Sequence, residues 1–159
     1  MTESSPQCLE IETVRHVAGT CLCLHTQRAA RALARLFDTA LAPYGLTHGQ
    51  FSLLMALNGP NPQTISRLAD FLAMDRTSLT AALKPLERKG LLHVTPSKDD
   101  KRARIITITP AGVAVLGEAV HIWRHTHGLL DAALAQGAPD RLRADLRLVP
   151  ASAAAVATP

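Results

Sequence analysis

The sequence predicts a mainly α-helical fold that carries one small β-hairpin. Between residues 64 and 90, apolar residues recur at helical spacing in two short runs, separated by Ala73-Met74-Asp75. Beyond Gly90, apolar and polar residues alternate on both sides of a charged segment, which is typical of two paired strands. Two helices joined by a tight turn and followed by such a hairpin form a winged helix-turn-helix.

The two helices of this motif have clear boundaries. Thr64 and Asp75 are suited to cap the first and second helix, because their side-chain oxygens can accept free backbone amides. Gly90 follows the second helix at a position that favours the left-handed conformation. Pro85 removes the hydrogen bond to the carbonyl of Ala81, so we expect a kink inside the second helix.

The motif suggests contact with duplex DNA. The N-terminal end of the second helix enters the major groove, where Thr and Ser reach phosphates or base edges and Arg reads guanine. Cations on the wing suit phosphates or a narrow minor groove. The candidate DNA-binding residues are Thr64, Arg76, Thr77, Ser78, Thr80, Ala81, Lys84, Arg88, Lys101, Arg102 and Arg104. The alternative, a solvated helix beside a charged hairpin, is disfavoured by the run of cations on the wing.

The segments DRTSLTAALKPLERKGLL and DDKRARIITITPAG resemble the MarR family of bacterial transcriptional regulators. The wing signature of that family is an Asp, one intervening residue and an Arg, then a strand that ends in Leu-Thr, and a Gly. Asp100, Arg102, Thr109 and Gly112 match this signature, and Ile108 replaces the Leu. The resemblance implies that Asp100 supports Arg102, which enters the minor groove.

Long helical stretches flank the motif. Residues 9–42 carry an apolar face with a bend expected at Gly19-Thr20, and Thr109-Pro110 starts a further helical region, residues 110–148, that ends in a short helix from Pro139. Both stretches have more apolar surface than one small DNA-binding unit can cover. We therefore expect them to form a helical dimerisation region.

This reading divides the chain into parts. Residues 43–109 form the DNA-binding lobe, and residues 1–8 and 149–159 are expected to be flexible tails. The resemblance implies that the first helix and the last two helices of each subunit interlock in a homodimer. A twofold dimer presents its recognition helices about 10 base pairs apart, which suits an inverted-repeat operator.

Composition narrows the alternatives. A chain of 159 residues suits one domain, and its 3% aromatic content disfavours base-stacking surfaces for single strands. The net charge of +4 is compatible with duplex DNA. The polar N-terminus and the lack of a long apolar run predict a cytoplasmic protein with no membrane association, whose three cysteines are reduced.

Cys23, with Cys21, is a candidate redox sensor. The segment around Cys23 resembles the organic-hydroperoxide sensors of the family, but Gln27 and Phe37 stand where those sensors carry tyrosines. If Cys21 and Cys23 lie two apart on one helix, they point to different faces and do not readily form a disulfide with each other. The alternative is that both are small thiols packed in a helix interface.

The sequence leaves two other kinds of input signal to consider: a small-molecule effector and a metal ion. A small aromatic or lipophilic acid is a common effector in the family, and a cleft for it would be lined by His25, Arg31, Phe37 and Trp123. His121 and His125 have the spacing of a metal pair on a helix, but without further ligands the sequence supports a solvated face better than a metal site. No cofactor motif is present.

These patterns predict a DNA-binding transcriptional regulator, with repression as the expected mode, that is released from its operator by a signal. The chain is not expected to be an enzyme. Two rivals stay open: a cysteine-dependent thiol enzyme that uses Cys23, and a winged helix that binds protein rather than DNA. The enzyme lacks an orienting base, because His25 lies two residues away on the helix, and the cationic wing disfavours the protein-binding reading.

Overall fold

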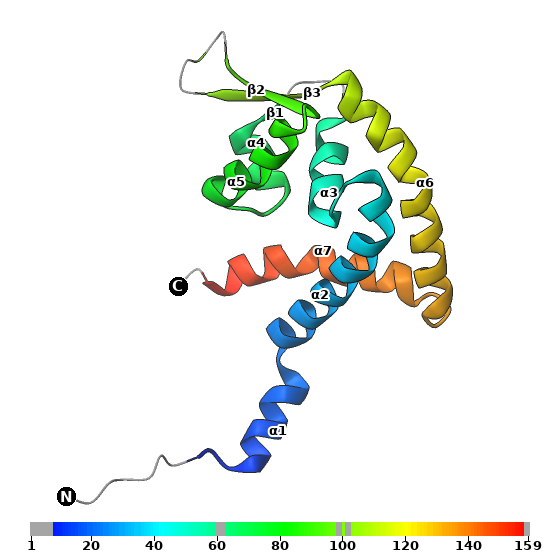
Figure 1. Ribbon diagram of the computed structural model, residues 1–159. Coiled ribbons are helices and arrows are strands. Elements are labelled where there is room, and N and C mark those ends of the chain that lie inside the picture. The colour runs from blue at the N-terminus through cyan, green and yellow to red at the C-terminus, as the bar shows by residue number, and fades with distance from the viewer. Residues whose placement is uncertain (1–7, 60–62, 98–99, 101–102, 158–159) are drawn as a thin grey trace, which may run out of the picture.

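The computed structural model describes residues 8–59, 63–97, 100 and 103–157. It is mainly helical with a small antiparallel sheet, which confirms the predicted fold class (Figure 1). Its elements are, in chain order, α1 (Ile11–Thr20), α2 (Leu22–Leu41), the 3-10 turn η1 (Ala42–Tyr44), α3 (His48–Leu57), β1 (Gln63–Thr64), α4 (Ile65–Phe71), α5 (Arg76–Arg88), β2 (Leu92–Pro96), β3 (Arg104–Ile108), α6 (Pro110–Ala133) and α7 (Ala138–Ala157).

The expected hairpin is present and gains a third strand. β2 pairs antiparallel with β3, with Leu92 opposite Ile108 and Val94 opposite Ile106. The two-residue strand β1 pairs with the other edge of β3, which gives the order β1-β3-β2. β1 is too short to show any periodicity in the sequence, so it was not predicted.

The predicted caps are confirmed. Asp75 Oδ1 accepts the Ser78 amide at 2.8 Å, and Thr64 Oγ1 accepts the Arg67 amide at 3.2 Å. The chain turns between α4 and α5 through Ala73, whose φ of 51° lies in the left-handed region. α5 continues through Pro85 as one helix.

The core lies where residues 43–109 meet α2 and α6. The most deeply buried side chains come from α2, α3, α4, α5, the sheet and α6, and include Leu41, Leu54, Leu68, Leu79, Leu86, Leu92 and Ile106. α6 contacts both α2 and α3 along its length, as Figure 1 shows on the right of the molecule. One continuous apolar core therefore joins the lobe to the flanking helices.

The N-terminal helical stretch is divided in two. The bend expected at Gly19-Thr20 lies at Cys21, whose backbone is extended (φ −71°, ψ 104°) between α1 and α2. Cys21 Sγ accepts the Leu24 amide at 3.4 Å and so caps α2. α1 buries none of its residues and projects away from the rest of the molecule in Figure 1.

The C-terminal helix is longer than expected. We expected a short helix that ends near Leu148, but α7 continues through Pro150 to Ala157. Alanine has the highest helix propensity, so the alanine-rich segment after Pro150 offsets the hydrogen bond that the proline removes. Arg143 joins α7 to α6 through Asp131, with Nη2 2.6 Å from Oδ1. Within the described part of the chain, no helix is long and apolar enough to cross a membrane.

Candidate nucleic-acid interface

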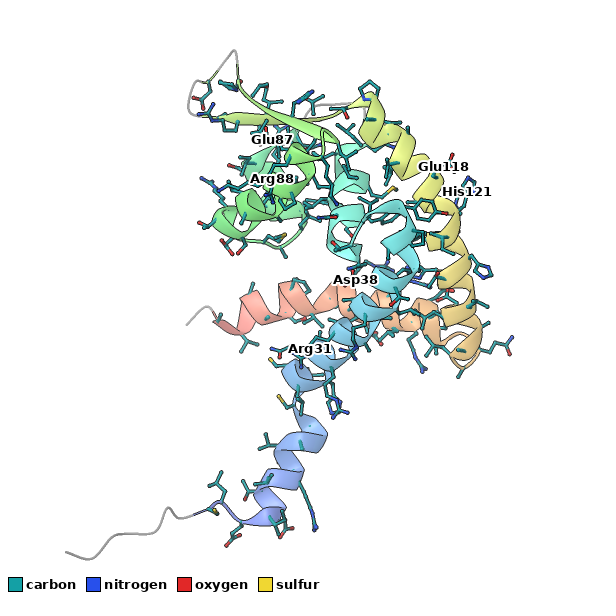
Figure 2. The ribbon with its side chains drawn as sticks, viewed as in Figure 1. Arg31, Asp38, Glu87, Arg88, Glu118 and His121 are labelled. Atoms are coloured by element: carbon teal, nitrogen blue, oxygen red, sulfur yellow. The ribbon has the colours of Figure 1, made fainter. Side chains whose placement is uncertain are left out.

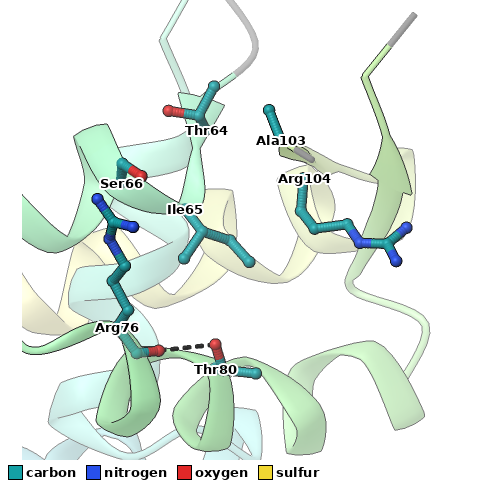
Figure 3. Close-up of a pocket in the computed structure, with 7 residues that line it drawn as sticks. All are labelled: Thr64, Ile65, Ser66, Arg76, Thr80, Ala103 and Arg104. Atoms are coloured by element: carbon teal, nitrogen blue, oxygen red, sulfur yellow. Dashed lines mark hydrogen bonds between the residues drawn. The ribbon is translucent and has the colours of Figure 1, made fainter. Parts of the chain in front are cut away.

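A polar groove lies where the N-termini of α4 and α5 meet the base of the wing (Figure 3). It has a volume of about 290 Å³ and is lined by Thr64, Ile65, Ser66, Arg76, Thr80, Ala103 and Arg104. Four of these residues were predicted DNA contacts. The pairing of Thr64 with Ile105, between β1 and β3, brings the start of α4 next to the wing. The groove therefore combines two guanidinium groups with three hydroxyl groups, which suits a phosphate backbone.

The N-terminal turn of α5 is exposed and held in place by its cap. The hydrogen bonds from Ser78 to the Asp75 carboxylate hold the pKa of that carboxyl below its ordinary value. The carboxylate thus remains charged at neutral pH beside the positive end of the helix. Thr77 and Ser78 are exposed, and Thr80 donates its hydroxyl to the Arg76 carbonyl at 2.7 Å. This leaves the Thr80 oxygen able to accept a further hydrogen bond.

A second group of predicted contacts lies further along α5. Ala81, Lys84 and Arg88 line a shallow groove of about 460 Å³ with Pro85 and Glu87. Figure 2 shows Arg88 and Glu87 on this helix. The predicted residues of α5 therefore form a continuous exposed surface from its first to its last turn.

The wing is fastened to α5 at its base. Glu87 Oε1 accepts the amide of Val94 in β2 at 3.2 Å, and the exposed Arg104 begins β3. Asp100 is exposed, and its carbonyl accepts the Ala103 amide at 2.9 Å. Lys101 and Arg102 lie outside the described residues, so the support of Arg102 by Asp100 stays a prediction.

Sequence reasoning missed three residues that line the groove. Ile65 and Ser66 begin α4, and Ala103 precedes β3. Ser66 follows a recognised helix cap, which was the one signal available. The other two carry no chemistry that a sequence pattern would single out, and only the β1–β3 pairing places them in the groove.

The two candidate redox cysteines do not share one helix, which corrects our expectation. Cys21 lies in the extended break between α1 and α2, and Cys23 lies in the first turn of α2. The argument that helical geometry separates their thiols therefore does not hold. Cys23 is exposed and Cys21 is half-buried. His25 Nε2 lies 3.3 Å from the carbonyl of Gly19, so its described contact is with the backbone rather than with a thiol.

The residues predicted to line an effector cleft fall into two places. Phe37 is 2% exposed, and its ring centroid lies 4.6 Å from that of His127, which in turn lies 4.3 Å from Trp123. His25 and Arg31 are exposed nearer the N-terminus of α2, where Arg31 donates to Gln27 at 3.4 Å (Figure 2 labels Arg31). The structure thus brings Phe37 and Trp123 into one aromatic cluster and leaves the two basic residues outside it.

Trp123 also lines an apolar pocket between α3, α4 and α6. The pocket has a volume of about 400 Å³, and its other lining residues are Phe51, Ser52, Met55, Ala56, Phe71 and Leu72. His121 lies on the outer side of α6 beside Glu118 (Figure 2). Among the described residues, no group of three His, Cys, Asp or Glu side chains is placed to hold a metal ion.

Comparison with known proteins agrees with this arrangement. A model of the MarR family matches residues 46–103, which span the helix-turn-helix and the start of the wing. The M. tuberculosis transcriptional regulator MosR, solved in complex with DNA, is 36% identical, with a TM-score of 0.78 over 86% of this chain and 98% of that one. The chain belongs to the MarR family.

Other MarR-type relatives match over shorter regions or at lower identity. The repressor CouR, bound to a 23-mer DNA duplex, is 27% identical with a TM-score of 0.75 over 91% of this chain and 99% of that one. The transcriptional activatory protein BadR of Rhodopseudomonas palustris is 31% identical over 60% of this chain. The chain spans about half of BadR, 53% of its length. The organic hydroperoxide resistance regulator of Bacillus subtilis is 27% identical over 64% of this chain and 69% of its own length.

Proposed function

We propose that this MarR-family chain is a DNA-binding transcriptional repressor that acts as a homodimer on an inverted-repeat operator and is released by a signal. The observation that carries the proposal is the groove in which Arg76 and Arg104 flank the hydroxyl groups of Thr64 and Thr80. Arginine and hydroxyl side chains are the usual partners of DNA phosphates. The related MosR, solved in complex with DNA, supports DNA binding by this chain.

The homodimer is supported by apolar surface that the single chain leaves exposed. Leu142, Leu146 and Val149 recur along one face of α7, and α7 buries none of its residues. On α1, Val14 and Val17 are likewise exposed. Exposed apolar side chains of this kind favour association, because burial of apolar surface is the main favourable term in forming a stable interface. We propose that residues 9–42 and 110–148, together with the continuation of α7 to Ala157, form the dimerisation region and that residues 43–109 form the DNA-binding lobe.

The DNA contact is tested by the salt dependence of binding. The probe is a labelled duplex that the wild-type protein selects from a random-sequence pool. We expect Arg104→Ala and Arg102→Ala each to weaken binding on most sequences and to lower the slope of log affinity against log salt by about one. Arg124→Ala on α6 is the matched control, with the same loss of charge away from the groove. Unchanged affinity in both wing variants would remove the wing from the interface.

A thiol-based signal is the second candidate, and the exposure of Cys23 beside the break at Cys21 favours it. The test compares DNA release by an organic hydroperoxide in the wild type and in Cys23→Ser. Release in the wild type alone supports a sensor at Cys23, and release that persists in the variant removes Cys23 from that role. If the hydroperoxide releases neither the wild type nor Cys23→Ser from DNA, the signal is not an oxidant, and a small-molecule effector is the remaining candidate.

A further inference from the structure

Lys89 follows Arg88 as the C-cap residue of α5, and although it is exposed, its side chain contacts a distant part of the fold. Lys89 ends α5, and its ammonium donates to the carbonyl of Gly45 at 2.6 Å. The same ammonium lies 3.5 Å from Gln50 Oε1. Both partners are more than 35 residues away in sequence, so this contact joins separate parts of the fold.

The partners of Lys89 belong to the turn that connects α2 with α3. Gly45 ends η1 in the left-handed conformation, with φ of 67°. Gln50 completes the capping box of α3, because its Oε1 also accepts the Thr47 amide at 3.2 Å. Lys89 therefore binds a turn whose shape is already fixed by local hydrogen bonds.

The same turn is fastened to α2 from its other side. Asp38, on α2, accepts the amide of His48 at 2.6 Å with its Oδ1 (Figure 2 labels Asp38 on this helix). Its carboxylate lies at the N-terminus of α3, where the helix dipole favours a negative charge. Polar contacts thus run without a gap from α2, through the start of α3, to the end of α5.

Apolar packing alone does not define the position of α5 so closely. Leu79, Leu83 and Leu86 are at most 2% exposed and hold the helix on the lobe. Apolar contact is non-directional, so it resists lifting the helix more than sliding or turning it. A hydrogen bond has a preferred distance and angle, and one at the end of the helix limits both movements.

We propose that Lys89 is a positioning residue for DNA recognition, which fixes α5 relative to α2 without itself contacting DNA. The inference rests on the proposed function, since α2 belongs to the proposed dimerisation region. In a dimer, the angle between α2 and α5 in each subunit sets the separation of the two recognition helices. Lys89 thereby contributes to the spacing of half-sites that the protein accepts.

The experiment separates a positioning lysine from a phosphate-binding one. Lys89→Gln is compared with Lys84→Gln, a matched change on the exposed surface of the same helix, using the selected duplex at a series of salt concentrations. Affinities are corrected for the fraction of active protein, so that partial unfolding does not imitate weaker binding. We expect Lys89→Gln to lower affinity about three- to tenfold with an unchanged salt slope, and Lys84→Gln to lower the slope by about one. Lys89→Arg, which keeps a cationic donor, should remain within about threefold of the wild type.

A second arm uses duplexes in which the two half-sites are moved by one or two base pairs. Lys89→Gln should discriminate less between these spacings than the wild type, which a loss of stability alone does not produce. A salt slope that falls by about one in Lys89→Gln, or an affinity and spacing preference equal to the wild type, would overturn the proposal.

A third arm needs no DNA and separates this inference from the proposed function. Hydrogen exchange of peptides that cover residues 42–50 should be faster in Lys89→Gln than in the wild type, and unchanged in Lys84→Gln. If the wild type selects no duplex, the proposed function fails, while faster exchange still supports the link from Lys89 to the turn. Equal exchange in the wild type and Lys89→Gln contradicts the link itself.

Discussion

The hydroxyl of Thr109 donates a hydrogen bond to the carbonyl of Gly90 over 2.7 Å, which ties the start of α6 to the turn behind α5. The same Oγ1 accepts the amide of Gly112 at 3.0 Å and so caps α6. Thr109 is buried, and its amide donates to the carbonyl of Leu91 at 3.0 Å. One residue therefore caps the long helix α6 and also holds the turn that follows α5.

We expect Thr109→Ala to lower the free energy of unfolding by about 1–3 kcal/mol, because it removes a helix cap and leaves the Gly90 carbonyl without its donor. Thr109→Ser keeps the hydroxyl, so its free energy of unfolding should fall by clearly less than that of Thr109→Ala. Urea unfolding followed by circular dichroism measures both variants. Equal losses in the two variants would show that the methyl group, rather than the hydroxyl, carries the effect.

Gly112 leaves no room for a side chain. A Cβ at this position would lie 2.1 Å from the carbonyl oxygen of Leu91 and 2.8 Å from Cγ1 of Ile108. Gly112→Ala should therefore destabilise the fold by about 1–3 kcal/mol or more, because α6 must move away from the turn. Gly117→Ala is the matched control in the same helix, since nothing lies within 4 Å of its Cβ. That change should stabilise by about 0.5–1 kcal/mol in the same urea measurement.

Ala73 holds a left-handed backbone conformation between α4 and α5, with φ of 51°. This conformation costs an L-residue about 1–2 kcal/mol, and glycine adopts it without that cost. Ala73→Gly should stabilise the protein by about 0.5–1 kcal/mol after the greater entropy of glycine in the unfolded chain is counted. Ala114→Gly, at an exposed position inside α6, should instead destabilise by a similar amount. Thermal unfolding of both variants shows whether each substitution raises or lowers the stability of the protein.

His127 gives stability a dependence on pH. Burial lowers the pKa of His127, opposed by the nearby Asp131 and assisted by Arg143 and His48. The folded state then binds a proton less readily than the unfolded state, whose pKa is about 6.5. This contribution is fully present above pH 6.5 and is lost progressively as the pH falls below it.

The measurement is urea unfolding of the wild type and of His127→Gln above and below that pH. The wild type should lose more stability than the variant between the two conditions. The quantity compared is the change in unfolding free energy between the two pH values in each protein. The packing energy that His127→Gln removes is the same at both pH values, so it does not affect this change. A larger loss in the variant contradicts the assignment.

The exposed stripe on α7 predicts the oligomeric state. Leu146→Asp places a charge among Leu142 and Val149 and should convert the proposed dimer to a monomer or weaken it by at least tenfold. Ala144→Asp adds the same charge on the opposite side of the helix and should leave the mass unchanged. Sedimentation velocity over a range of concentrations distinguishes these outcomes. A wild type that sediments as a monomer at every concentration would contradict the dimer.

The sequence predicted the fold class because its determinants are local. Thr64, Asp75 and Thr109 each cap a helix by accepting the amide three residues later, and alternation in β2 and β3 identifies the strands. Two helix ends were misplaced. We expected the N-terminal break at Gly19-Thr20, but the thiol of Cys21 caps α2 instead. We expected Pro150 to end the last helix, but the alanine-rich segment after it continues α7 to Ala157.

The candidate DNA contacts on α5 could be predicted for the same reason, since one helix face follows from helical periodicity. What the sequence by itself determined was therefore the order of elements, their caps, and the polar face of α5. The tertiary structure alone decided which distant residues come together: Ser66 and Arg104 line one groove, Phe37 contacts His127 in the core, and Lys89 contacts Gly45 at the turn. Such contacts depend on how apolar faces pack and how strands register across long separations, and no local pattern specifies those relationships.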